Sequence, residues 1–60
     1  MYEEKLIEIL NRKKVVIQLE ELARLMYCSV STVKRCQFYI NKTTPNLIKT
    51  KLGRKGGYYI

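Results

Sequence analysis

Hydroxyl and basic side chains follow one another in the segment SVSTVKR, which begins at Ser29. Serine is a residue type that caps helix N-termini, and the Ser29 hydroxyl and backbone N–H would also suit a phosphate oxygen. Further along, Ser31, Lys34 and Arg35 can donate hydrogen bonds to base edges, and a guanidinium pairs with both O6 and N7 of guanine. Thr32 could bond either a phosphate or a base. This spacing favours recognition of a nucleic acid.

These side chains share one surface if a helix runs from Ser29, as its N-cap, to about Asn41. Steps of about 100° per residue, counted from Val33 at the centre of the buried face, separate two groups. Within about 60° of Val33 lie Val30, Cys36, Gln37 and Ile40. On the opposite side lie Ser31, Arg35 and Phe38, flanked by Thr32 and Lys34. We therefore expect a polar, basic stripe that faces away from the core.

Positive charge is concentrated in the second half of the chain. Residues 1–30 carry five cations and five glutamates, whereas residues 31–60 carry seven cations and no acid, which accounts for the formal charge of +7. A solvated face normally mixes both signs, so an acid-free half predicts a polyanionic partner. The alternative is a basic tail that serves solubility alone.

The elements before this segment would hold the stripe in place. Residues 2–12 have apolar side chains at helical spacing, with acids early and cations late, as the helix dipole favours. The sequence VVI at 15–17 predicts a small strand. A second helix follows from the i, i+3, i+4, i+7 spacing of Leu19, Leu22, Ala23 and Met26.

After Asn41 the sequence predicts a turn and a hairpin. The segment NKTTPN ends the helix because Pro45 disfavours helix at Thr44. The segment LIKTKL at 47–52 and the closing YYI are expected as strands, joined by the glycine-rich basic loop GRKGG. Sixty residues without a linker or repeat make a single domain, 1–60, which is mainly α with a small β-hairpin.

The segment IQLEELARLMYCSVSTVKRC resembles the DNA-binding motif of DeoR-type repressors, Mga-type and BglG-type regulators and the biotin-repressor DNA-binding domain. The matching positions are Ile17, Glu21, Leu22, Ala23, Met26, Cys28, Ser29, Thr32, Val33 and Arg35. The ending LGRKGGYYI is similar to the wing of that family, so the resemblance covers nearly the whole chain. Tyr27 and Gln37 depart from it, since the family often has Asn or Gly at the first position and usually Leu at the second. A bulky residue at the first position is strained if the backbone needs a positive φ there.

The resemblance implies a winged helix-turn-helix, with three helices and a two- or three-stranded wing. It implies sequence-specific binding of double-stranded DNA in transcriptional regulation, with the helix at about 30–41 in the major groove. The basic wing, about 47–60, would contact the backbone or minor groove. The base-reading candidates are Ser31, Thr32, Lys34, Arg35 and Phe38, of which Phe38 could touch a thymine methyl. The phosphate-contacting candidates are Ser29, Lys42, Lys49, Lys51, Arg54 and Lys55.

Two other binding functions remain open. Phe38 and Tyr39 could instead form a surface for a protein partner. Binding of RNA or single strands would need exposed aromatic side chains among the basic residues, and Tyr58 and Tyr59 are the candidates. Packing within the hairpin is the favoured role for those two tyrosines.

Catalysis, metal binding and a cofactor are not expected. The chain has no histidine or aspartate, and its five glutamates have no paired partner. Cys28 and Cys36 are too few for a structural zinc site, and a helical path of eight residues separates them by roughly 10–12 Å, beyond the roughly 7 Å limit for a disulfide. Both are expected as small buried residues in a reducing cytoplasm. The same absence of reactive groups predicts no small-molecule ligand for this domain.

The sequence also sets expectations for the cellular context. No apolar run approaches the roughly 18 residues of a membrane span, so we expect no membrane partner and a cytoplasmic, nucleoid-associated protein of bacterial, phage or plasmid type. The chain ends at Ile60, where the wing should end, which fits a piece of a larger regulator slightly better than a complete small protein. The sequence does not indicate the oligomeric state: the remainder of a larger regulator and a second copy of the chain, as a homodimer on DNA, are alternative partners, and the isolated domain is expected to be monomeric.

Overall fold

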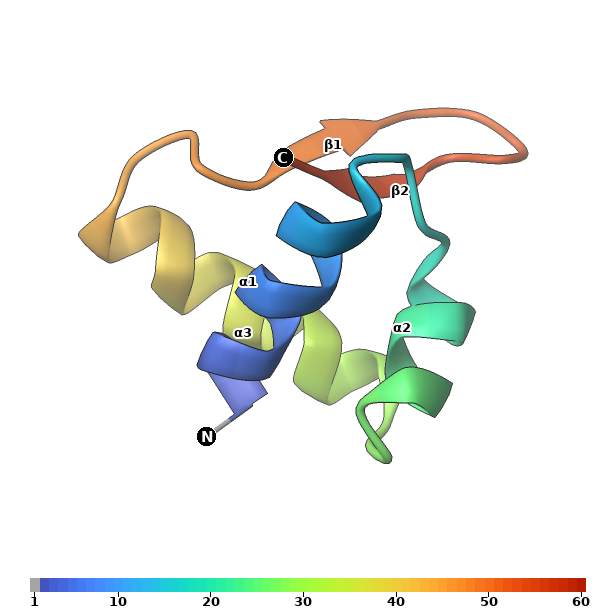
Figure 1. Cartoon of the computed structure of the whole chain (residues 1–60), viewed down its shortest axis with the longest axis horizontal. Coiled ribbons are helices and arrows are strands. Elements are labelled where there is room, and N and C mark those ends of the chain that lie inside the picture. Colours follow the sequence, from blue (N-terminus) through green and yellow to red (C-terminus); the bar gives the residue numbers. More distant parts are fainter. Residues whose placement is uncertain (1) are drawn as a thin grey trace.

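The computed structural model describes residues 2–60 and has three helices followed by a two-stranded antiparallel hairpin (Figure 1). The elements are α1 (Tyr2–Lys13), α2 (Leu19–Leu25), α3 (Val30–Thr43), β1 (Lys49–Lys51) and β2 (Gly57–Tyr59). In Figure 1 the hairpin lies above the helices, and its loop extends to the side above α2. The predicted class, mainly α with a small β-hairpin, is confirmed.

The core is one cluster, and α3 packs against both α1 and α2 around it. Its buried side chains come from the three helices, β2 and the connectors: Leu6, Leu10, Ile17, Leu22, Ala23, Met26, Val33, Cys36, Ile40, Ile48 and Tyr58. Strand β1 contributes none, since all three of its residues are exposed. The hairpin is therefore joined to the core through Ile48 before β1 and Tyr58 in β2.

Helix α1 extends one residue past the predicted range. Glu3 and Glu4 lie in its first turn and Arg12 and Lys13 in its last, so the charges at both ends compensate the helix dipole. Leu6 and Leu10, one turn apart, are completely buried. Lys14 ends the helix with a left-handed φ of 54°.

The strand predicted at 15–17 is reduced to one bridge. Ile17 and Tyr58 exchange two backbone hydrogen bonds of 3.0 Å, while Val15 is exposed. The extended segment is short because Lys14 precedes it in a left-handed conformation and Gln18 already serves as the N-cap of α2. A Cβ at Gly57 would collide with the Ile17 carbonyl oxygen, so glycine permits this close approach.

The connection between α2 and α3 is a tight turn. Tyr27 N–H donates to the Arg24 carbonyl at 3.2 Å and Cys28 N–H donates to the Ala23 carbonyl at 2.9 Å. These two bonds form a Schellman motif, whose left-handed position is usually glycine. Here that position is Tyr27, with φ of 55°. The departure noted in the sequence is therefore a site of backbone strain.

Helix α3 starts as predicted but ends two residues later than Asn41. Ser29 caps it, because its hydroxyl accepts a hydrogen bond from the Thr32 N–H at 3.2 Å. The helix continues to Thr43 because Pro45 restricts the residue directly before it, and Thr44 accordingly leaves the helical region at φ −127° and ψ 89°.

The hairpin is fixed to α3 by one side chain. The Asn41 amide donates to the Ile48 carbonyl and its oxygen accepts from the Ile48 N–H, both at 2.9 Å. Ile48 precedes β1, which pairs with β2 in the register Lys49 to Tyr59, Thr50 to Tyr58 and Lys51 to Gly57. One amide thus joins the end of the long helix to the start of the hairpin.

Candidate nucleic-acid interface

The outward face of α3 has the composition that the helical spacing predicts. Ser31, Lys34, Arg35 and Phe38 are exposed, and Thr32 is partly exposed. On the opposite side Val33, Cys36 and Ile40 are buried, with Val30 and Gln37 half-buried. The burial of the apolar side fixes the rotation of the helix, so the hydroxyls and cations face solvent.

Ser29 has a structural role at the start of this face. Its hydroxyl lies 3.2 Å from the Thr32 N–H and 3.1 Å from the Thr32 hydroxyl. The two hydroxyls therefore bond each other, and Ser29 also caps the helix end. Their contact with a phosphate stays a prediction.

The cations of the hairpin and of the last turn of α3 are all exposed. They are Lys42, Lys49, Lys51, Arg54 and Lys55. No ion pair joins any of the seven cations of the second half to an acid within residues 2–60. None of these cations is therefore neutralised by a direct ion pair within the described residues.

The loop of the hairpin is a tight turn. The Gly56 N–H donates to the Gly53 carbonyl at 3.1 Å, and Gly53 has a φ of 112°, which side chains rarely adopt. A Cβ at Gly56 would collide with the Lys51 carbonyl oxygen. The two glycines let the chain reverse closely and place Arg54 and Lys55 at the centre of the turn.

One surface depression brings part of the predicted site together. It is lined by Val30 and Lys34 of α3, by Gly53, Arg54 and Gly56 of the loop, and by Gln18, Leu19 and Glu20 at the start of α2. The Gln18 side-chain amide donates to the Arg54 carbonyl at 3.5 Å, a long bond that links loop and helix. Lys34 and Arg54 therefore share one hollow although twenty positions separate them.

The other predicted site residues do not line this depression. Ser31, Arg35 and Phe38 lie on the open face of α3, and Lys55 lines a separate hollow that also includes Lys13 and Glu21. The depression is also lined by Glu20, an acid from the first half of the chain, which the fold places beside Lys34 from the second half. The second half is free of acids, but its surroundings are not.

Two further exposed side chains, one shortly before α3 and one directly before the hairpin loop, were not among the predicted site residues. Tyr27 and Leu52 are each 87% exposed. The sequence did contain a signal for Tyr27, since a bulky residue stands where the resembled family often has Gly or Asn. Leu52 sits directly before the glycine-rich loop, but its exposure depends on where the core ends, which the sequence does not indicate.

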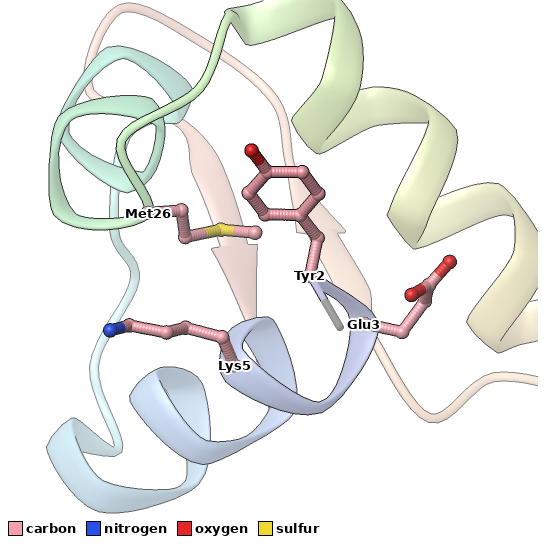
Figure 2. Close-up of a pocket in the computed structure, with 4 residues that line it drawn as sticks. All are labelled: Tyr2, Glu3, Lys5 and Met26. Carbon is pink, nitrogen blue, oxygen red and sulfur yellow. The ribbon is translucent and has the colours of Figure 1, made fainter.

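A different hollow lies between the start of α1 and the end of α2, lined by Tyr2, Glu3, Lys5 and Met26 (Figure 2). The Tyr2 ring and the Met26 side chain point toward each other, whereas the Lys5 ammonium points away from them. Glu3 points toward α3. These groups do not converge on a common point, so this hollow lacks the charge pattern found beside α3.

The two cysteines are free thiols, Cys36 buried and Cys28 partly buried. Burial raises the pKa of the Cys36 thiol above its usual value, and the nearby Glu3 charge adds to this rise. Burial also raises the pKa of the Tyr58 hydroxyl. Both groups therefore stay neutral near pH 7, as suits members of a core.

Comparison with protein-family models, curated proteins and solved structures gave no match to this chain. Among residues 2–60, no group of three or more cysteine and glutamate side chains is placed to hold a metal ion. Over the same residues, none of the helices has the length and apolar character needed to cross a membrane.

Proposed function

We propose that this chain is a winged helix-turn-helix domain that binds double-stranded DNA sequence-specifically in transcriptional regulation. In this proposal α3 enters the major groove and the hairpin, as the wing, contacts the backbone or the minor groove. The observation that carries the proposal is the pairing of an outward α3 face, rich in hydroxyls and cations, with a basic loop that shares a depression with Lys34.

The dimensions of DNA support this arrangement. The major groove of B-DNA is about 12 Å wide and accepts one helix, whose N-terminal half meets the base edges. Ser31, Lys34 and Arg35 lie on the exposed side of that half of α3. Arg35 is the strongest candidate for direct readout, because a guanidinium can pair bidentately with guanine. The hairpin cations would position the domain without reading sequence.

A salt titration tests the electrostatic part of the proposal. If about five phosphates are neutralised, log K should fall with log salt with a slope near −4 to −5. The measurement is fluorescence anisotropy with a labelled random-sequence duplex at several salt concentrations. Affinity that does not change between low and moderate salt would contradict the proposal.

Selection of bound duplexes from a random pool tests the sequence-specific part. On a selected duplex, Arg35→Ala should weaken the binding free energy by about 1–3 kcal/mol and relax the sequence preference at one base pair. Arg12→Ala is the matched control, since Arg12 is a similarly exposed arginine on α1. If Arg35→Ala weakens all duplexes equally, Arg35 contacts a phosphate and does not read a base.

A protein-interaction module is the second candidate. Phe38 and Tyr39 are 63% and 50% exposed, and their rings pack edge to face with centroids 5.9 Å apart. Such an aromatic pair could anchor a protein partner. The same anisotropy titration separates the two functions, because an interaction module without a DNA function should show little affinity for random duplex at low salt.

A further inference from the structure

The hairpin loop presents one large apolar side chain among its cations. Leu52 is 87% exposed and is surrounded in the sequence by Lys51, Gly53, Arg54 and Lys55. Ile48 and Leu52 flank strand β1, one directly before it and the other directly after it. Yet Ile48 is only 2% exposed. Ile48 belongs to the core cluster, whereas the loop that follows Leu52 extends to the side above α2 in Figure 1.

The loop is held in a fixed shape beyond the core. The Gly56 to Gly53 hydrogen bond closes the turn, and the Ile17–Tyr58 bridge fixes β2 to the connector between α1 and α2. Gln18 contacts the loop itself through the Arg54 carbonyl. Leu52 is therefore presented by a supported turn.

The shape and charge of this loop fit the minor groove of duplex DNA. A two-stranded ribbon fits the major groove, about 12 Å wide, whereas the minor groove is only about 6 Å wide, so only the turn at the tip of the hairpin can enter it. A hairpin tip can enter it end-on only where side chains are missing, as at Gly53 and Gly56. A narrow minor groove attracts arginine and lysine, and proteins that bind there often insert an apolar wedge between base steps.

Resting on the proposed DNA-binding function, we propose that Leu52 is such a wedge. It enters the minor groove beside Arg54 and Lys55, separates two stacked base pairs and bends the duplex. The wing then has two kinds of contact: its cations bind phosphates or the groove floor, and Leu52 favours steps that unstack easily, such as TA.

The test uses a duplex of alternating adenine and thymine in which some adenines are replaced by 2-aminopurine, a fluorescent base whose emission rises when it unstacks. The wild-type chain at low salt should raise this emission as it binds, with binding followed separately by anisotropy. Leu52→Ala should remove most of the emission rise. Its affinity should fall by less than about tenfold, because the weaker apolar packing is offset by the unstacking that no longer occurs.

Two matched variants separate the wedge from other effects. Leu52→Met keeps an apolar side chain of similar reach and should retain the emission rise, whereas Leu52→Gln is of similar size but polar and should lose it. Thermal unfolding should be nearly the same for all three, since the side chain is exposed.

The outcomes distinguish this proposal from the function on which it rests. Wild-type binding without an emission rise, or an equal rise with Leu52→Ala, overturns the wedge and leaves DNA binding intact. Absence of wild-type binding to any duplex overturns both. An anionic lipid surface could attract the same loop, so vesicles of phosphatidylglycerol form a second arm. Leu52-dependent vesicle binding without an emission rise would also overturn the wedge.

Discussion

Helices α1 and α2 each contain one ion pair, whereas α3 and the hairpin contain none among the described residues. Glu8 accepts a hydrogen bond from Arg12 at 3.2 Å, and Glu21 lies 3.7 Å from Arg24. Within residues 2–60, no cation from α3 or the hairpin has a comparable partner. Both regions nevertheless contribute to the same core.

This difference shows that the stability of the fold depends little on how the surface charges are paired. Exposed ion pairs such as Glu8–Arg12 contribute at most about 1 kcal/mol, so neither region depends on them for its fold. Unpaired like charges repel one another and lower the stability of a compact state. The fold itself gives the cations of α3 and the hairpin no ion-pair partner, and the proposed binding to DNA would supply one.

The largest expected effect comes from removing two cations from α3, compared with removing two cations from α1. Lys34→Gln with Arg35→Gln should weaken duplex binding by about 10- to 1,000-fold and make the salt slope shallower by about 2, because two cations no longer face the DNA. Lys5→Gln with Arg12→Gln removes the same net charge from α1 and should change binding little. Anisotropy titrations measure both, and equal losses of affinity in the two double variants would show that only net charge matters.

A smaller effect is expected where α3 is joined to the hairpin, within the second region. Asn41→Ala removes both hydrogen bonds to the Ile48 backbone and should lower the free energy of unfolding by about 1–3 kcal/mol. Asn11→Ala changes an exposed asparagine on α1 and should be nearly neutral. Urea unfolding followed by circular dichroism gives both values. A neutral Asn41→Ala would mean that the core alone holds the hairpin in place.

The smallest expected effect is a gain in stability at two strained positions, Lys14 after α1 and Tyr27 after α2. Tyr27→Gly should raise the free energy of unfolding by about 0.5–1 kcal/mol, because relief of left-handed strain is partly offset by the flexibility of glycine in the unfolded chain. Lys14→Gly, at a φ of 54°, should give a similar gain. Thermal melts of the two variants test this. A loss of stability in Tyr27→Gly alone would show that the tyrosine ring makes a stabilising contact.

Local sequence signals were sufficient to predict the three helices and which side of α3 is buried. The Ser29 cap and the rotation about Val33 depend on residues within a few positions of each other, and both were predicted. The boundary at Thr43 could also have been set more closely, since Pro45 constrains only the residue before it.

The remaining features depend on contacts between distant segments. The 15–17 strand was reduced to Ile17 because only that residue lies opposite Tyr58. Glu20 reaches the Lys34 depression through the packing of α2 beside α3. The exposure of Leu52 reflects the limit of the core. These three features depend on which distant segments pack together, so the helical and strand periodicity of the sequence cannot predict them.

The two attachments of the hairpin have a consequence for association. Asn41 holds the chain just before β1, and Ile17 holds β2 from the other side. With both strands fixed, the hairpin has little freedom to rotate against the helices. The conformational entropy of orienting it is therefore lost during folding, and a partner that contacts both α3 and the loop meets a preorganised surface.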